Sequence, residues 1–237
     1  TYEQVIAQGL SGIAGFRHRA FGEEQKTHFL TGVSAALGGG LLTSNLGYDI
    51  DSQAGLDTNY RISLGRHDVS TGLYFATDEF SPTSVSENPT TFGTRASVKG
   101  PLLNLGRYPV DYSLFGSFNE DASGESITNL KQNFSTNIDG IRLNHTLDYF
   151  GPSAEGADDQ LSSLVSASGT AFKGLRWRAR ADYQYKPENT LTDTYFELSK
   201  KIHPEVTAVA ELEHRPEARY TKGTLRANWQ TMDQIIT

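Results

Sequence analysis

A strict two-residue alternation over residues 175–185 constrains the fold more than any other feature of this sequence. The first set of alternating positions is apolar or aromatic, and the positions between them are polar: Leu175, Trp177, Ala179, Ala181, Tyr183 and Tyr185 against Arg176, Arg178, Arg180, Asp182 and Gln184. Successive side chains of a β-strand point to opposite faces, so one face is apolar and the other carries three arginines. Helical spacing does not fit this pattern. The segment is therefore predicted to be a two-faced strand.

The same alternation recurs along the whole chain and predicts a protein built from strands. About 12–14 strands are expected, at residues 12–21, 28–37, 42–50, 54–64, 69–76, 92–99, 109–118, 126–134, 140–150, 161–172, 175–185, 193–200, 206–213 and 222–229. Short proline-marked reversals and longer polar loops separate them, which indicates an antiparallel meander. No shift of composition divides the chain. Residues 1–237 are accordingly predicted to form a single domain, interpreted as a mature or excised part of a longer chain.

The composition excludes several classes of protein. The 237 residues contain no cysteine, which excludes a disulfide scaffold, a cysteine metal site and cysteine-nucleophile chemistry. No run of about 18 apolar residues is present, so no transmembrane helix is predicted. The formal net charge of −7 argues against a nucleic-acid partner, because phosphate binding needs a basic field. The 23 Gly, 11 Tyr and 12 Phe, against a single Met, favour an all-β protein.

Strand length and aromatic placement favour lipid as the environment of the apolar face. Several predicted strands reach ten or eleven residues, whereas soluble strands average about 5–6 and tilted membrane strands need about 9–11. Trp177 and the pair Tyr183 and Tyr185 lie toward opposite ends of one apolar face, as the aromatic girdles of a membrane barrel do. We therefore predict a meander that closes into a transmembrane β-barrel. The alternative is a soluble β-sandwich, in which the apolar faces meet a second sheet.

The polar face needs water or charged partners, because an unpaired buried charge is very costly. In a barrel this face lines the lumen. The predicted lumen-facing or substrate-facing residues are Arg61, Arg95, Arg142, Arg176, Arg178, Arg180, Asp182 and Arg226. Two interpretations of the arginine stripe stay open. It binds anionic sugars or selects anions, or it forms a structural ladder with acids such as Glu197, Glu211 and Glu213 or a solvated sheet face.

Two phrases, residues 110–118 and 175–183, resemble the strands of bacterial outer-membrane β-barrels, both porins and fimbrial ushers. The resemblance lies in the strand pattern, with no diagnostic motif. It implies a pore in the bacterial outer membrane, with membrane lipid as a partner and with an anionic solute or a secreted polypeptide as the passenger. In this pattern His145 falls on the lipid-facing side of its strand.

No motif of the chain predicts catalysis. The six histidines, at positions 18, 28, 67, 145, 203 and 214, form no metal-binding spacing, and no Gly-x-Ser-x-Gly sequence occurs. The run Gly38-Gly39-Gly40 lacks phosphate-loop spacing and predicts a turn between two strands. We therefore expect no enzyme activity, catalytic residue, metal or cofactor. The predicted function is an outer-membrane pore or translocation channel. The alternative is a soluble or surface-exposed β-rich binding or structural domain without transport activity.

Overall fold

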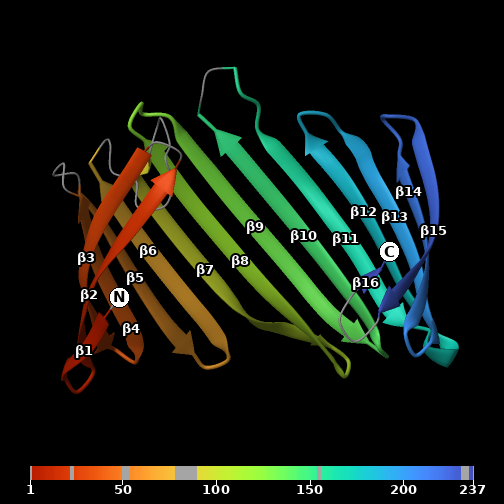
Figure 1. Cartoon of the computed structure of the whole chain (residues 1–237), viewed down its shortest axis with the longest axis horizontal. Helices are drawn as coiled ribbons and strands as arrows, with labels where there is room; N and C mark the ends of the chain where they lie inside the picture. The colour runs from red at the N-terminus through yellow and green to blue at the C-terminus, as the bar shows by residue number, and fades with distance from the viewer. Residues whose placement is uncertain are drawn as a thin grey trace. The chain divides into compact units, whose positions relative to one another are not determined.

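The computed structural model describes residues 2–21, 24–49, 54–77, 90–153, 156–230 and 235–236, and these residues are almost entirely strand (Figure 1). One short 3-10 helix, η1 (Phe172–Gly174), interrupts them. The strands are β1 (Tyr2–Ala7), β2 (Leu10–Phe21), β3 (Glu24–Leu37), β4 (Gly40–Asp49), β5 (Ala54–Leu64), β6 (His67–Ala76), β7 (Thr90–Leu105), β8 (Tyr108–Asp121), β9 (Ser126–Ile138), β10 (Ile141–Pro152), β11 (Gln160–Thr170), β12 (Arg176–Lys186), β13 (Thr190–His203), β14 (Val206–Arg215), β15 (Tyr220–Gln230) and β16 (Ile235–Ile236).

Each strand pairs with its neighbours in chain order, from β1 to β16, so the fold is an all-β meander as predicted. The pairings that define β1 to β7 and β11 to β16 are antiparallel. The fourteen predicted segments correspond to β2 to β15, and β1 and β16 raise the number to sixteen. In the described part of the chain this order begins at β1 and ends at β16, and the sheet is not closed.

The described chain forms two compact units. Unit 1 consists of residues 1–100, 113–130 and 150–157, and unit 2 consists of residues 101–112, 131–149 and 158–237. Unit 1 therefore holds β1 to β6, and unit 2 holds β11 to β16. Strands β7 to β10 contribute residues to both units. The single barrel domain stays a prediction.

In each unit the two ends of the strands differ in the length of their connections. After β1, β3, β5, β7, β9 and β13 the chain turns through two residues, and after β11 through five. From β4 onward, the connections after even-numbered strands are three to thirteen residues long. Adjacent antiparallel strands place these two sets at opposite ends. We name them the short-turn end and the long-loop end.

Positive φ angles explain two of the tight turns. Gly38 (φ 57) and Gly39 (φ 81) join β3 to β4, which confirms the predicted glycine turn. Asp139 (φ 49) and Gly140 (φ 85) join β9 to β10. Positive φ at both central residues is the requirement of a type I′ turn, whose twist matches that of the flanking strands.

The four-residue connection between β8 and β9 is held by a carboxylate. Asp121 accepts hydrogen bonds from the Ser123 hydroxyl at 2.6 Å and from the backbone N–H groups of Ser123 and Glu125 at 2.9 and 3.0 Å. These bonds, led by the Ser123 hydroxyl, lower the pKa of Asp121 below its usual value. They stabilise the turn while Asp121 is ionised, and they weaken as the pH falls through this lowered pKa.

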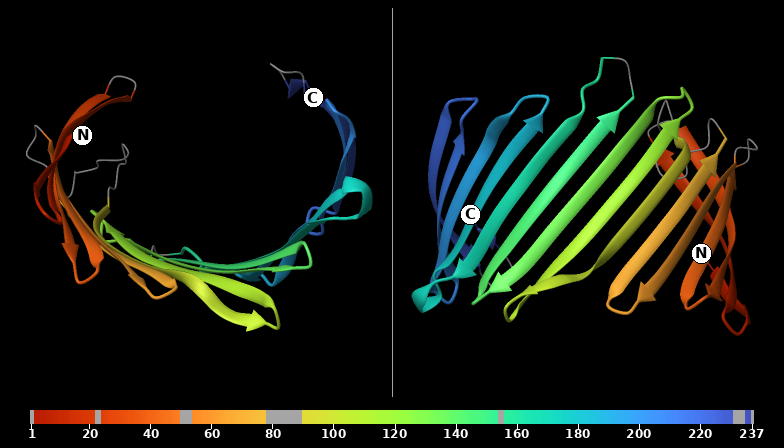
Figure 2. Two further views of the ribbon diagram at one scale, coloured as in Figure 1. Left: turned by 90° about the horizontal axis from the view of Figure 1, so that it is seen from below. Right: turned by 180° about the vertical axis from the view of Figure 1, so that it is seen from behind.

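The described residues contain almost no buried apolar core. Val209, at 7% exposure, is the single large hydrophobic residue among them that is buried, while many others are exposed. Figure 2 shows β12 to β15 as a single layer of strands. Within the described part of unit 2, therefore, no second sheet covers the apolar face of these strands, as the alternative sandwich would require. This exposed apolar surface needs another covering.

Strands β3 and β4 approach closely at Gly32, so a substitution there tests the register between the two strands. A Cβ at Gly32 would meet the backbone oxygen of Ser44 and lie 2.5 Å from Asn45 Oδ1. At Gly223 no atom lies within 4 Å of the corresponding position. We expect Gly32→Ala to lower the free energy of unfolding by at least about 1 kcal/mol, and Gly223→Ala to be neutral or slightly stabilising. Urea unfolding in detergent micelles measures both, and equal effects would contradict the close approach.

Candidate translocation surface

The polar face of unit 2 is defined by the register of β11 to β15. The pairings align five rows of mostly polar side chains on one face: Ser162, Leu164, Ser166, Ser168 and Thr170 on β11; Arg176, Arg178, Arg180, Asp182 and Gln184 on β12; Asp193, Tyr195, Glu197, Ser199 and Lys201 on β13; Thr207, Val209, Glu211, Glu213 and Arg215 on β14; Lys222, Thr224, Arg226 and Asn228 on β15. Arg142 lines hollows on this face. Unit 2 thus gathers six of the predicted site residues.

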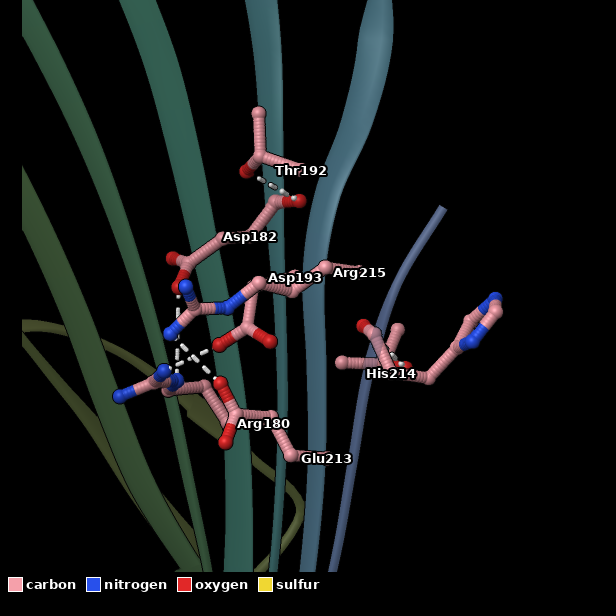
Figure 3. A network of polar contacts seen from close by, with 8 residues as sticks. Arg180, Asp182, Thr192, Asp193, Glu213, His214 and Arg215 are labelled. Carbon is pink, nitrogen blue, oxygen red and sulfur yellow. Dashed lines mark hydrogen bonds and ion pairs between the residues drawn. The ribbon is translucent and has the colours of Figure 1, made fainter. Parts of the chain in front are cut away.

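Arg180 holds two carboxylates that face each other across β12 and β13. Asp182 and Asp193 are directly paired in the register, where two like charges repel. Arg180 donates Nη2–H to Asp193 Oδ2, and its Nε lies 3.3 Å from Asp182 Oδ2 (Figure 3). The Asp193 side chain is only 14% exposed. The guanidinium offsets the repulsion, so this arginine acts as a structural bridge.

The neighbouring residues complete this network. The Arg180 guanidinium carbon lies 5.8 Å from the centre of the Tyr195 ring. Glu213 pairs with Arg215, with Nη2 2.6 Å from Oε1. In Figure 3 the His214 ring points away from this cluster, as the alternation of β14 requires.

A second carboxylate pair, Glu197 and Glu211, lies opposite across β13 and β14. The Tyr195 hydroxyl lies 2.8 Å from Glu197 Oε2 and 3.0 Å from Glu211 Oε1. Its single proton is donated to one carboxylate at a time. Arg226 Nη2 lies 2.6 Å from Glu211 Oε1, and the Glu211 side chain is 17% exposed. This ion pair is of the kind that the ladder interpretation predicts.

Arg142, Arg176 and Arg178 differ from these bridging arginines. All three are exposed, and none forms an ion pair with a residue that the structure describes. Arg178 is opposite Glu197 in the register, but the bonding partner of that carboxylate is Tyr195. We name these three residues, together with the exposed Lys201, the cationic cluster.

The cationic cluster lines a hollow of about 730 Å³ on the polar face. Ser168, Thr170 and Thr207 line the same hollow. Arg142 and Arg176 stand at or next to the start of β10 and β12, and Lys201 stands near the end of β13. All of these positions belong to the short-turn end. Cations without an ion-pair partner among the described residues and hydroxyl groups therefore line one hollow at the short-turn end of the strands.

Unit 1 carries the other two predicted site residues, Arg61 and Arg95. The register of β5 to β7 puts both on one face, where Arg61 is opposite Ser70. Arg95 Nη2 lies 2.9 and 3.2 Å from the two carboxylate oxygens of Asp57. Arg95 is thus another paired arginine. The lumen-facing role of all eight residues stays a prediction, and the structure assigns them to the polar faces of two units.

Sequence reasoning did not single out Asp193 and Tyr195, two central members of the polar network. A usable signal was present in residues 193–198, where Asp193, Tyr195 and Glu197 alternate with Thr194, Phe196 and Leu198. This is the same two-residue period that identifies β12.

The apolar face of unit 2 carries aromatic residues at both ends of its strands. Trp177 and Trp229 lie at the short-turn end, whereas Tyr183 and Tyr185 lie at the long-loop end. Between them the face presents aliphatic and aromatic carbon, including Ala179, Phe196, Leu212 and the 85% exposed Leu225. Two aromatic bands that flank an apolar zone are typical of a membrane-spanning sheet.

His145 is the polar exception that the sequence pattern places on this face. Its Nε2 lies 2.9 Å from the Ser163 hydroxyl, and its ring stacks on Phe134 with the centroids 6.4 Å apart. Ser163 is 5% exposed. Each polar group thus supplies the hydrogen bond that the other needs in an apolar environment.

Comparison with known proteins finds a solved structure with a similar fold. No protein-family model matches this sequence, and no curated protein matches it. The chain is similar to the solved structure of a bacterial polysaccharide outer membrane secretin. The TM-score is 0.52 at 13% sequence identity, and the match covers 94% of this chain and 84% of the other. At that identity the likeness shows the fold alone, and it fits the predicted β-barrel architecture.

Among the described residues, no helix has the length and apolar character that a membrane crossing would need.

Proposed function

We propose that this chain forms the wall of a translocation pore in the bacterial outer membrane. Its apolar face contacts lipid, and its polar face borders the aqueous path. The observation that carries the proposal is the two-faced character of β12 to β15. The same strands present exposed Leu212 and Leu225 on one side and the bridged carboxylates of Asp193 and Glu211 on the other. Water suits only the second face.

Three further observations support a membrane location. Strands β2 to β15 are 10–16 residues long, enough for tilted strands to cross a bilayer. The apolar face of unit 2 carries aromatic residues at both ends of its strands, and short turns alternate with longer loops, as in outer-membrane barrels. The likeness to a bacterial polysaccharide outer membrane secretin adds a translocating protein of similar fold.

The proposed mechanism is passive. Backbone N–H and C=O groups are paired between neighbouring strands, so the wall exposes few unpaired backbone groups to lipid. The bridged carboxylates keep the polar face hydrated and prevent Arg180 and Arg226 from binding the passenger tightly. A hydrophilic solute or polymer then moves along the charged surface without chemical change. The proposal includes no catalytic step and no cofactor.

Folding in the presence and absence of amphiphile tests the proposal. We expect a compact, heat-modifiable β species only with detergent micelles or lipid vesicles, measured by gel migration and circular dichroism. Planar bilayers that contain this species should show discrete ion conductance. A monodisperse β protein in plain buffer would overturn the pore and favour a soluble β-rich binding or structural domain.

A further inference from the structure

We infer that the cationic cluster of Arg142, Arg176, Arg178 and Lys201 binds the carboxylate groups of an acidic polysaccharide at the entrance of the pore. This inference rests on the proposed function and adds the chemical class of the passenger and the place where it is first bound. The cluster is a binding site, with no covalent step.

The first step of the argument is the contrast between paired and unpaired arginines on one face. Arg180 and Arg226 are bound to Asp193 and Glu211, so their charge is already compensated. Arg176 and Arg178 stand on the same strand as Arg180 and form no ion pair with a described residue. A structural ladder has no need of these uncompensated positive charges, whereas the binding of an anionic ligand depends on them.

The second step is the charge of the surrounding hollow. Two carboxylates line it together with the cluster, Glu197 and Glu205. Glu197 accepts a hydrogen bond from the Tyr195 hydroxyl, and Glu205 accepts one from Trp229 Nε1 at 3.0 Å. These donors stabilise the acids without the arginines. Arg226 also lines the hollow, but it is paired with Glu211. The four cations of the cluster therefore face two carboxylates, which leaves the hollow electropositive.

The third step is position. The cluster lies at the short-turn end of the strands, next to the two-residue turns after β9 and β13. In outer-membrane barrels the short turns face the periplasm and the long loops face the outside. An exported polymer therefore meets the cationic cluster first, before it passes the bridged carboxylates.

The fourth step is the chemistry that fits the lining. A guanidinium group binds a carboxylate through two parallel N–H donors, a geometry that lysine does not share. Ser168, Thr170 and Thr207 add hydroxyl groups suited to sugar hydroxyls. The lining offers few apolar side chains, Trp177, Pro204 and Val209, for the apolar residues of a polypeptide. These features favour an acidic polysaccharide.

Binding of polygalacturonate to the full chain in detergent micelles tests the inference. The test variant replaces Arg142, Arg176 and Arg178 by Gln. The matched control replaces Arg66, Lys173 and Arg219, three exposed cations in the connections between strands, by Gln, and changes the net charge equally. We expect the dissociation constant to rise at least about tenfold in the test variant and less than about twofold in the control. A triple Arg→Lys variant should bind with intermediate affinity.

Three other polymers define the ligand class. Neutral dextran should not bind, and raising the salt concentration should weaken polygalacturonate binding to the wild type. Tighter binding of poly-glutamate than of polygalacturonate would overturn the polysaccharide assignment. If the triple Gln substitution weakened the binding of polyphosphate but not that of polygalacturonate, the carboxylate assignment would be overturned.

The failures of the two proposals are distinguishable. In one outcome the wild type forms the heat-modifiable, conducting species, and the triple Gln variant binds polygalacturonate as tightly as the wild type does. That outcome contradicts the entrance site but not the pore proposal. If no such species forms in any amphiphile, the pore proposal itself fails. If the triple Gln variant does not fold, the single variants R176Q and R178Q are measured instead. An unchanged affinity for polygalacturonate in both variants would contradict the entrance site.

Discussion

The substitution Ala179→Arg should prevent most of the protein from inserting into lipid vesicles. Ala179 lies on the apolar face, opposite Ala167 and Phe196 and between the two aromatic bands of unit 2. Placing arginine on the lipid-facing side of a barrel strand costs about 2–4 kcal/mol near the bilayer midplane. The measurement is the fraction of heat-modifiable protein in vesicles, together with the free energy of unfolding from urea titration.

Gln184→Arg is the matched control for this prediction. Gln184 stands on the same strand but on the polar face, two residues from Asp182, so an added cation there meets water and a carboxylate. We expect normal insertion. If both arginine variants insert equally well, lipid does not cover the apolar face. If Ala179→Arg prevents folding even in lipid-free buffer in which the wild type folds, the face is instead a protein interior.

Glu211→Ala should strongly destabilise the polar face of unit 2. It removes the ion-pair partner of Arg226 and one of the two acceptors near the Tyr195 hydroxyl. Hydrogen bonds to charged groups contribute about 1.5–3 kcal/mol, and we expect a loss of this size in the free energy of unfolding. Glu211→Gln keeps a hydrogen-bond acceptor and should lose less. Urea titration in detergent micelles measures both variants.

Glu217→Ala provides the control, because Glu217 is an exposed acid in the turn between β14 and β15. It should change the free energy of unfolding by less than about 0.5 kcal/mol. A double-mutant cycle of Glu211→Ala with Arg226→Ala then isolates the coupling between the two side chains. A coupling near zero would show that the pair is solvated and would contradict its bridging role.

The amino-acid sequence by itself determined the strands and their two faces. In a strand the side chains alternate for reasons of local backbone geometry, so the pattern of residues 175–185 is legible without any knowledge of neighbours. The same argument predicted the glycine turn at Gly38 and Gly39 and the position of His145 on the apolar face. It assigned all eight predicted site residues to polar faces.

The sequence pattern did not predict strands, or parts of strands, that form because they pair with a neighbouring strand. Strand β1 mixes polar and apolar residues on both faces, and β16 has only two residues, yet each pairs with a neighbour. Strand β7 continues past Pro101 to Leu105, beyond the predicted end at residue 99. Backbone pairing to an adjacent strand overrides weak local preference in such places.

Only the tertiary structure decided which arginines are bound and which are free. Arg178 and Arg180 occupy equivalent positions of one alternating pattern, but Arg180 meets Asp193, whereas Arg178 finds Glu197 already bonded to Tyr195. The same holds for His145, whose partner Ser163 comes from the next strand. Alternation is set within a strand. The identity of a cross-strand neighbour depends on the register between strands, which turn lengths and backbone hydrogen bonds establish only on folding.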